Sequence, residues 1–427
     1  MNFTNVNSNR KIKICVVGLG YVGLPLAVKF AKHFKIVGFD INKKRIEELK
    51  NNYDRNLQIN KKELEEVSKN IEFTDEEDKI GEANIFIVTV PTPLTENKKP
   101  DLSFLKEASK IVGRNLKRGS IVVYESTTYP GCTEEVCLPI LEKESRLKLG
   151  EFSIGYSPER ISPGDKEHTL ESTYKIVAGY DEETTKRLSE IYGKITNIYP
   201  VDSIKIAEAA KVVENTQRCL NIALFNELAR IFDKLKIDSK KVFDAAATKW
   251  NFHRYYPGFV GGHCISVDPY YLLEKANNSG YISEFIKLGI LINEEIPYFV
   301  AKKIIELLKD KNKSIEESKI LILGAAYKEN VPDLRESKVK NLIEKLKSLG
   351  IDKINIFEPL IERKNIFGVE NINKFEKYDV IVYTVNHKEF KNIDIYNILK
   401  KEGIIIDIRR RFDKQEVENR GFTYWGL

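Results

Sequence analysis

Cysteine is scarce in this sequence, with only five among 427 residues. Their number is odd and no two have Cys-x-x-Cys spacing, which excludes a disulfide-built scaffold and argues against a structural zinc site. We therefore expect reduced thiols, a cytoplasmic location and no metal. The five are Cys15, Cys132, Cys137, Cys219 and Cys264.

Long apolar runs and a strong charge imbalance are also missing. No stretch approaches the ~18 apolar residues that span a bilayer. The polar, Asn-rich residues 1–10 predict a disordered N-terminus rather than a signal peptide. Lys and Arg total 69 against 63 for Asp and Glu, a net charge of +6. We therefore expect no nucleic-acid or membrane partner, whereas an anionic ligand would account for part of the excess.

A glycine-rich turn follows the first apolar run. Gly18, Gly20 and Gly23 form G-x-G-x-x-G before a helical pattern, and Asp40 ends the next apolar run. The first glycine allows a tight turn, the second lets backbone amides approach a pyrophosphate, and the third permits close helix–strand packing. A carboxylate at Asp40 would bind ribose hydroxyls and repel a 2′-phosphate. The turn therefore predicts NAD as cofactor, with Arg45 either pairing with a phosphate or lying on the helix surface.

The length predicts two or three domains. Residues 11–201 alternate continuous apolar runs with amphipathic segments, which is typical of a parallel sheet covered on both faces. Residues 202–312 are mainly helical, and residues 313–427 return to the alternating pattern. We predict an α/β fold in which two Rossmann-like parallel-sheet domains are joined by a central all-helical domain with a long connecting helix. That helix is also a candidate dimer seam.

Two threonines follow later predicted strands. Thr92 lies in VPTP and Thr127 in YESTTYPG. Ligands in open α/β sheets bind beyond the carboxyl ends of the strands, so both side chains are candidates for cofactor contact. Both are equally good caps for turns or helices, and the pattern leaves the two interpretations open.

Residues 255–271 concentrate the unusual chemistry. Cys264 follows three glycines, and Asp268 lies four residues beyond it. Crowded glycines indicate close backbone approach to a ligand, and a thiol just past such a turn can be exposed and activated. Asp268 is placed to position a water or accept a proton. His263 adjoins the cysteine, so we favour backbone packing or a ligand contact for it over catalysis. The glycines are Gly258, Gly261 and Gly262.

A polar stripe lies on the long predicted helix. Lys211, Asn215 and Arg218 fall at i, i+4 and i+7, hence on one face. Such a stripe is usually the solvent side of a helix. The neighbouring positions are rich in Ala and Val, however, so a substrate oxygen or phosphate as partner is an equal alternative.

Ordered motifs now identify a resemblance. Seven motifs follow one another along the chain in this order: VVGLGYVGLPLA, VPTP, YESTTYPG, SPER, AEAAKVVENTQR, GFVGGHCISVDPYY and LGAAYKENVPDLRES. They resemble blocks of the UDP-glucose/GDP-mannose dehydrogenase family, from Lys11 to about Arg410. The resemblance implies oxidation of a sugar C6 alcohol to a uronic acid with two NAD⁺ and one water, through a cysteine thiohemiacetal and thioester.

The resemblance also implies roles for individual residues. Cys264 is the implied nucleophile, Lys211 with Asn215 is implied to stabilise oxyanions or move protons, and Asp268 to act with a water as base. Thr127 and Glu159 match positions that help to hold this water. The implied cofactor contacts are Gly18, Gly20, Val22, Gly23, Asp40, Arg45, Thr92, Thr127 and Arg335. The implied UDP-sugar contacts are Arg160, Ile161, Lys211, Asn215, Arg218, Gly261, Tyr327, Lys328 and either Arg409 or Arg410.

One departure from the family pattern bears on the sugar. UDP-glucose and GDP-mannose enzymes usually have a Ser before the cysteine and Pro-Lys-Asp after it, where this chain reads GGHCISVDPYY. With SPERISPGD and KWNF, it resembles members that act on N-acetylated UDP-hexosamines. We expect UDP-N-acetylglucosamine, with UDP-N-acetylgalactosamine, UDP-N-acetylmannosamine and then UDP-glucose as alternatives, a role in surface polysaccharide biosynthesis, and a homodimer.

Two other functions would use the same domain order. A single-step hydroxyacid dehydrogenase would rely on Lys211 alone and have no use for Cys264, so it would be insensitive to alkylation. A regulatory protein would bind NAD or a nucleotide sugar without turnover, and the presence of the thiol, lysine and aspartate argues against it.

Overall fold

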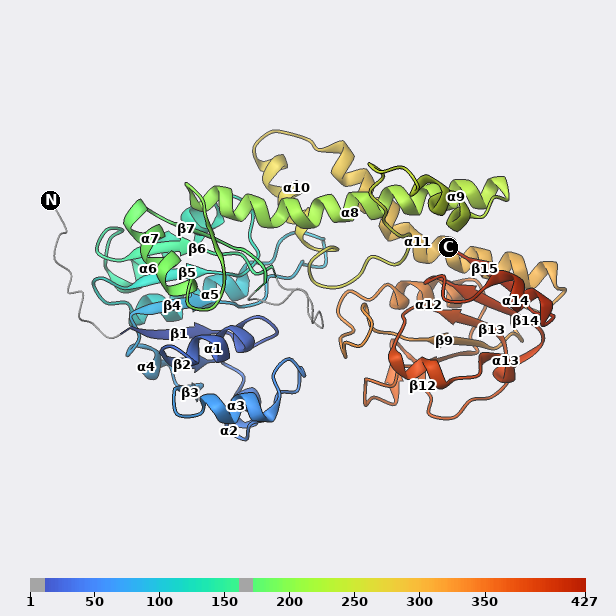
Figure 1. Ribbon diagram of the computed structural model, residues 1–427, viewed down its shortest axis with the longest axis horizontal. Helices are drawn as coiled ribbons and strands as arrows, with labels where there is room; N and C mark the ends of the chain where they lie inside the picture. Colours follow the sequence, from blue (N-terminus) through green and yellow to red (C-terminus); the bar gives the residue numbers. More distant parts are fainter. Residues whose placement is uncertain (1–11, 161–171) are drawn as a thin grey trace. The chain divides into compact units, whose positions relative to one another are not determined.

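The structure is a computed structural model that describes residues 12–160 and 172–427. The segment 1–10 and the candidate residue Ile161 lie outside the described residues. Each of two compact units contains a mainly parallel sheet with helices against it, which confirms the predicted α/β fold (Figure 1). The first unit runs to Glu214 and includes Tyr270–Gly280, and the second comprises Asn215–Pro269 and Tyr281–Leu427.

The first sheet is built from runs of Ile, Val and Phe. Its strand order is β3-β2-β1-β4-β5-β6-β7-β8, and every pairing in it is parallel except that of β6 with β7. Strands β4 and β5 are buried along their whole length, as a sheet covered on both faces requires. The strands are β1 (Lys13–Val17), β2 (Lys35–Phe39), β3 (Ile71–Thr74), β4 (Ile85–Val88), β5 (Ile121–Tyr124), β6 (Ser153–Tyr156), β7 (Lys175–Gly179) and β8 (Ile198–Pro200).

Alternate residues of these strands enter two separate cores. Ile14 and Val16 of β1 join one hydrophobic cluster, and Cys15 and Val17 join the other. The first cluster includes side chains of α1, α3 and α7, and the second includes those of α5 and α6. Helices therefore cover both faces of the sheet. The helices are α1 (Gly23–Ala31), α2 (Lys43–Lys50), α3 (Lys61–Val67), α4 (Glu77–Ile80), α5 (Ser103–Asn115), a π-helical turn (Thr133–Cys137), α6 (Leu138–Ser145) and α7 (Glu182–Tyr192).

Four further helices occupy the segment predicted to be helical. They are α8 (Ile204–Leu235), α9 (Ser239–Ala246), α10 (Asp268–Asn278) and α11 (Glu284–Asp310). Helices α8 and α11 approach closely at Gly289, where an added Cβ would lie 2.3 Å from Leu220 Cδ2. The boundary between the units falls inside α8, between Glu214 and Asn215. Among the helices of the described residues, none combines the length and apolarity needed to cross a membrane.

The second sheet has the order β11-β12-β10-β9-β13-β14-β15, and only β11 with β12 is antiparallel among its pairs. Strands β9 and β13 are wholly buried. The strands are β9 (Ile320–Leu323), β10 (Ile354–Phe357), β11 (Asn365–Ile366), β12 (Val369–Asn371), β13 (Tyr378–Tyr383), β14 (Leu399–Asp407) and β15 (Thr423–Gly426). The helices are α12 (Val339–Ser348), a 3-10 turn (Lys388–Asn392), α13 (Ile395–Ile398) and α14 (Lys414–Asn419).

The turn after β9 repeats the turn after β1. Gly18 and Gly324 each have φ of +96°, a left-handed conformation that favours glycine. The hydroxyl of Thr89 donates to the carbonyl of Gly18 at 2.7 Å, and that of Thr384 donates to the carbonyl of Gly324 at 2.8 Å. The two units therefore share one way of presenting a loop at the carboxyl edge of a sheet.

Each unit has a carboxylate just after the strand that follows its glycine turn, Asp40 after β2 and Glu358 after β10, and the two differ in exposure. Asp40 is half-buried, whereas Glu358 is 1% exposed and accepts two backbone N–H groups of the loop after β9. His387 Nε2 lies 3.1 Å from Glu358, and its Nδ1 accepts the N–H of Asn330, which assigns the donor proton to Nε2. Burial alone would raise the pKa of Glu358, but the hydrogen bonds from His387 and the backbone hold that pKa below its usual value. Glu358 is therefore enclosed and unavailable to a ribose.

Replacing His387 with alanine is expected to destabilise the second unit by about 3 kcal/mol, because the buried carboxylate of Glu358 loses a donor. His387 is fully buried. Thermal unfolding followed by circular dichroism would show a lower midpoint. His33→Ala, at an exposed histidine, serves as control and should change the unfolding free energy by less than about 0.5 kcal/mol. Equal midpoints for the two variants would contradict the expectation.

Candidate active site

The three glycines after β1 differ in their surroundings. A Cβ added at Gly23 would lie 1.9 Å from the carbonyl oxygen of Gly18, so a side chain has no room where α1 packs on the strand. A Cβ added at Gly20 would meet no atom within 4 Å. Val22 precedes α1 and is half-buried. The turn thus leaves open space at the glycine whose backbone would approach a pyrophosphate.

Asp40 and Arg45 support this turn from beyond β2. Asp40 Oδ2 accepts the backbone N–H of Leu19 at 2.8 Å, and its Oδ1 accepts that of Asn42 at 2.9 Å. Arg45 is 4% exposed, donates from Nε to the carbonyl of Leu19 and pairs with the buried Asp54 at 2.7 Å. The alternative that Arg45 lies on the helix surface is wrong, because Asp54 provides a buried counter-charge.

Replacing Gly20 with alanine is expected to weaken NAD⁺ binding by at least about tenfold while leaving stability nearly unchanged, because the new methyl group enters open space that the cofactor would use. The matched control is Gly23→Ala, whose methyl group would collide with the backbone of Gly18 and lower the unfolding midpoint. NAD⁺ titration by calorimetry and thermal unfolding separate the two effects. Wild-type affinity in Gly20→Ala would contradict this placement of the cofactor.

The loops after β4 and β5 carry the two candidate threonines. Thr92 and Thr127 are both half-buried. The segment just after Thr127 is held by Glu208 of α8, which is fully buried. Glu208 accepts the hydroxyls of Thr128 (3.1 Å) and Thr133 (2.7 Å), the N–H of Thr133 (2.9 Å) and that of Gly131. Burial raises the pKa of Glu208, and these donors act against that rise. Glu208 was not predicted, since an acidic residue on a helix gives no signal of a contact about eighty residues away.

Lys211 lies next to Glu159 within the first unit. Lys211 is 7% exposed, and its Nζ donates to the carbonyl oxygen of Glu159 at 2.7 Å. Arg160 donates to the carbonyl of Tyr174 at 2.7 Å and pairs with Glu214 at 2.8 Å. The SPER segment and helix α8 are therefore joined at the lysine that the resemblance marks as catalytic.

Cys264 sits directly before helix α10 in the second unit. Its backbone carbonyl accepts the N–H of Val267 at 3.0 Å and that of Asp268 at 2.8 Å. Asp268 is the first residue of α10 and fully buried, and Asn215 Nδ2 donates to its Oδ2 at 2.5 Å. The chain therefore places a thiol about one turn from a buried carboxylate that is held by an amide.

The glycines before Cys264 pack against a tyrosine. Gly262 has φ of +85°, and a Cβ added there would lie 2.6 Å from the ring of Tyr327. A Cβ added at Gly261 would lie 2.7 Å from the carbonyl oxygen of Glu336. The ring of His263 meets that of Tyr327 edge-on at 6.0 Å. The glycines thus bring the cysteine segment against the loop after β9.

Asn226 holds the start of the same segment and was not predicted. Its side chain is fully buried, accepts the N–H of Gly258 at 2.8 Å and donates to the carbonyl of Gly258 at 3.1 Å. It also donates to Asn293 of α11 at 2.8 Å. Arg218, the third residue of the polar stripe predicted on this helix, is exposed. Asparagines in an apolar helix were the available signal, because a buried amide requires partners.

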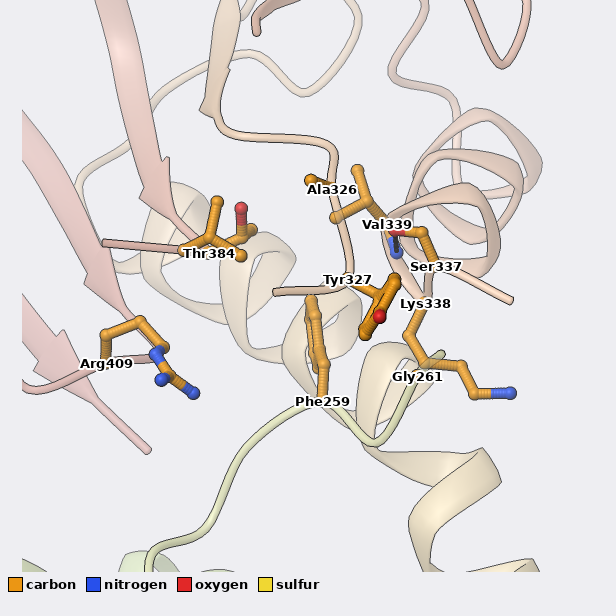
Figure 2. Close-up of a pocket in the computed structure, with 10 residues that line it drawn as sticks. Phe259, Gly261, Ala326, Tyr327, Ser337, Lys338, Val339, Thr384 and Arg409 are labelled. Atoms are coloured by element: carbon orange, nitrogen blue, oxygen red, sulfur yellow. Dashed lines mark hydrogen bonds between the residues drawn. The ribbon is translucent and has the colours of Figure 1, made fainter. Parts of the chain in front are cut away.

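A small cavity of about 20 Å³ lies at the carboxyl ends of β9, β13 and β14. Figure 2 shows three predicted substrate residues in its lining, Gly261, Tyr327 and Arg409. Lys338, which was not predicted, is 3% exposed and pairs with Glu294 at 2.7 Å. The other residues of the lining are Phe259, Ala326, Ser337, Val339, Thr384 and Val385.

The remaining candidate cations of this unit lie in different surroundings. Arg410 donates to the carbonyl of Leu427 at 2.7 Å and to Ser239 at 2.6 Å, so its guanidinium is engaged at the start of α9. Lys328 is half-buried on the loop after β9. Arg335 is exposed and donates to both carboxylate oxygens of Asp333. Of the two arginines in question, the structure brings only Arg409 to the cavity.

The five cysteines, all within the described residues, separate clearly. Cys15, Cys132, Cys137 and Cys219 are buried, and Cys264 is partly exposed. Burial raises the pKa of Cys15 and raises that of Cys219 to about 11. Cys264 is thus the accessible thiol of the set. The described part of the chain contains no group of His, Cys, Asp and Glu side chains arranged to hold a metal ion.

Three models of one protein family match the chain in order. They describe the NAD binding domain, the central domain and the UDP binding domain of the UDP-glucose/GDP-mannose dehydrogenase family, and they match residues 12–196, 205–295 and 321–414. The cavity residues Tyr327 and Arg409 fall within the third match, and Cys264 falls within the second.

Relatives match over nearly the full length. UDP-N-acetyl-D-glucosamine 6-dehydrogenase of Salmonella typhi is 46% identical over 410 residues, covering 93% of this chain and 96% of that protein. The protein of the same name from Pseudomonas aeruginosa is 44% identical over 422 residues, covering 96% and 100%. The structure of UDP-D-ManNAc dehydrogenase from Pyrococcus horikoshii is similar with a TM-score of 0.88 at 31% identity, covering 97% and 99%.

Proposed function

The chain belongs to the UDP-glucose/GDP-mannose dehydrogenase family and is an NAD-dependent UDP-sugar dehydrogenase, and from this premise we propose that it oxidises C6 of UDP-N-acetylglucosamine twice to form the uronic acid. The overall change consumes the alcohol, two NAD⁺ and one water. It yields the carboxylate, two NADH and three protons.

The observation that carries the proposal is the environment of Cys264. This thiol is partly exposed while the other four cysteines are buried, and it precedes the buried Asp268 by four residues. The Cys264 sulfur adds to the aldehyde carbon left by the first oxidation, and a proton moves to the oxygen. Loss of hydride from its carbon, with loss of the hydroxyl proton, converts this thiohemiacetal to a thioester, which water cleaves to the acid and the free thiol.

Residues of the first unit supply charge and orientation in this proposal. Lys211 is nearly buried and held by the carbonyl of Glu159, so its ammonium has a fixed position. A fixed cation stabilises the negative oxygen that develops when the thiol or water adds to a carbonyl. The carboxylate of Glu159 and the hydroxyl of Thr127 orient the attacking water.

NAD⁺ supplies the hydride acceptor when bound. The residues that fit it are those of the turn after β1, where Gly20 leaves open space and Asp40 presents a half-buried carboxylate for a ribose. We propose Val22, Thr92, Thr127 and Arg335 as further contacts, and Arg45 as a cofactor-site residue that acts through the backbone of Leu19.

We propose that the UDP moiety binds beside the ends of β9, β13 and β14, where the cavity, with room for about one water, marks only part of its site. Arg409 and Lys338 place cations in its lining, and Phe259 and Tyr327 place aromatic rings there. A diphosphate and a planar base need these two kinds of groups. We propose Arg409 rather than Arg410 as the arginine that contacts the ligand. The other proposed contacts are Arg160, Ile161, Lys211, Asn215, Arg218, Gly261 and Lys328.

The sugar is proposed from two kinds of support. Relatives named as UDP-N-acetyl-D-glucosamine 6-dehydrogenases share 44–46% identity with this chain, whereas the solved UDP-D-ManNAc dehydrogenase shares 31%. The motif GGHCISVDPYY also resembles members that act on N-acetylated hexosamines. We propose a cytoplasmic role in surface polysaccharide biosynthesis, with UDP-N-acetylgalactosamine and UDP-N-acetylmannosamine as alternative substrates.

An NADH assay against UDP-hexosamines and UDP-hexoses tests the reaction and the sugar together. UDP-N-acetylglucosamine is expected to give the highest kcat/KM and two NADH per sugar. One NADH per sugar with free aldehyde accumulating would refute the cysteine mechanism. A higher kcat/KM for another sugar of the panel would reassign the substrate.

We propose a homodimer that uses the exposed apolar faces of α8 and α11. Leu224 of α8 is 53% exposed, and Phe285 of α11 is 72% exposed. Neighbours on the same helices, Ile231, Leu235, Leu288 and Leu291, are also exposed. Apolar side chains gathered on two packed helices are typical of an interface. Sedimentation equilibrium is expected to give twice the chain mass, and a single-chain mass would refute the dimer.

A further inference from the structure

A buried lysine lies behind Glu159 in the first unit and has no role in the reaction described so far. Lys175 is the first residue of β7 and is 2% exposed. Its Nζ lies 2.5 Å from an oxygen of Glu125, which follows β5 and is itself 2% exposed. Taking an ammonium group and a carboxylate out of water is unfavourable, and a salt bridge between them often fails to compensate for this. Stability alone is therefore a weak reason for the pair.

The surroundings of Glu125 fix the position of this pair. The hydroxyl of Tyr192, the last residue of α7, donates to the other oxygen of Glu125 at 2.5 Å. The Lys175 ammonium also lies 5.5 Å from the centre of the Tyr192 ring. Burial raises the pKa of Glu125, and the adjacent Lys175 acts against that rise. The lysine is thus anchored from its buried side by two neighbouring elements.

The outer side of Lys175 faces the SPER segment. Its Nζ donates to the carbonyl of Pro158 at 3.3 Å and lies 3.9 Å from Glu159 Oε2. The Glu159 side chain is 12% exposed, so its carboxylate is at the border of the buried network. The other carboxylate oxygen accepts the N–H of Arg160 at 2.7 Å. Lys175 therefore contacts both the turn that carries Glu159 and one oxygen of its carboxylate.

Two lysines from different elements thus hold Glu159: Lys211 of α8 donates to its backbone carbonyl, and Lys175 of β7 lies beside its side chain. A carboxylate that orients a water needs a fixed direction, because a misdirected acceptor leaves the water poorly aligned for attack. We infer that Lys175 is a positioning residue that orients the Glu159 carboxylate for hydrolysis of the thioester.

This inference rests on the proposed function and concerns one of its steps. In that step, water adds to the thioester carbon, the carbon–sulfur bond breaks, and the acid and the Cys264 thiol are released. The two oxidations precede it and do not require the water. Loss of Lys175 should therefore slow hydrolysis and spare both hydride transfers.

The test uses the double variant Glu125→Gln/Lys175→Met, which removes both buried charges together and leaves neither unpaired. Rapid mixing with UDP-N-acetylglucosamine and NAD⁺ is expected to give a fast burst of about two NADH per active site, followed by steady turnover slower than wild type by about tenfold or more. Mass spectrometry of the quenched protein should find the sugar as a thioester on Cys264. Lys186→Met, at an exposed lysine of α7, is the matched control and should behave as wild type.

The outcomes distinguish this inference from the proposed function. Wild-type turnover without a burst in the double variant would show that Lys175 serves folding only. Equal slowing of burst and turnover would also overturn the inference. One NADH per sugar from the wild-type enzyme would instead overturn the proposed function, and this inference with it. If the double variant does not fold, Lys175→Arg takes its place, since it keeps the positive charge and moves it relative to Glu159. A burst in this variant supports the inference, and wild-type kinetics refute it.

Discussion

Replacement of Cys264 with serine is expected to abolish formation of the uronic acid, lowering kcat by about 10⁴-fold. The serine hydroxyl has nearly the same shape, and the backbone carbonyl at this position continues to accept the N–H groups of Val267 and Asp268 at the start of α10. The fold should therefore persist. A hydroxyl is a much weaker nucleophile than a thiolate near neutral pH, and an oxygen ester is less reactive toward water than a thioester.

Three measurements on Cys264→Ser separate chemistry from binding. NAD⁺ affinity measured by calorimetry should be unchanged, and acid production measured by chromatography should disappear. Alkylating reagents should no longer modify residue 264. Cys137→Ala is the control, because this cysteine is fully buried, and it should retain wild-type kcat. Full activity in Cys264→Ser would remove the thioester and favour a single-step dehydrogenase that relies on Lys211.

The fold was largely predictable because most of its strands and helices are indicated by patterns of neighbouring residues in the sequence. Apolar runs separated by amphipathic segments predicted parallel sheets in residues 11–201 and 313–427, where β1 to β8 and β9 to β15 lie, and helices between them, where α8 to α11 lie. The edge strands β3 and β15 are less evident in the sequence, because each is only partly buried. They therefore lack the continuous apolar run that indicates wholly buried strands of the same length, such as β4 and β9, and their pairing depends on the rest of the sheet.

The candidate site was predictable only where function requires a motif. The glycines after β1 and the cysteine segment have fixed spacing, so single residues were named from sequence. Glu208, Asn226 and Lys175 were missed, although each is buried and contacts a segment that carries a candidate catalytic residue. Their partners lie 17 to 80 residues away, and no local pattern specifies such contacts.

The enclosed Glu358 gives a physical reason why the glycine turns of the two sheets would bind different nucleotides. Both units present a glycine turn and a carboxylate beyond the next strand, but His387 and two backbone amides occupy the carboxylate of the second unit. Asp40 of the first unit remains half-buried and within reach of a ligand. The same fold is thus consistent with a dinucleotide at the first turn and a different nucleotide at the second.

Replacement of Asp268 with asparagine is expected to lower kcat by about 10²- to 10⁴-fold with little change in substrate KM. Asp268 is fully buried, begins α10 and accepts the amide of Asn215 at 2.5 Å. A helix N-terminus and an amide donor both favour a negative charge at this position, which suits a group that accepts a proton from water.

The substitution tests the charge rather than the shape. The carbonyl oxygen of an asparagine side chain can still accept from Asn215, so the fold and the start of α10 should be kept, while the proton acceptor is lost. Because the thiol remains, Asp268→Asn should accumulate the Cys264 thioester, whereas Cys264→Ser cannot form one. Asp310→Asn, at the exposed end of α11, is the control and should match wild type. A kcat for Asp268→Asn within about threefold of wild type, too small for the loss of a general base, would assign proton transfer to another group.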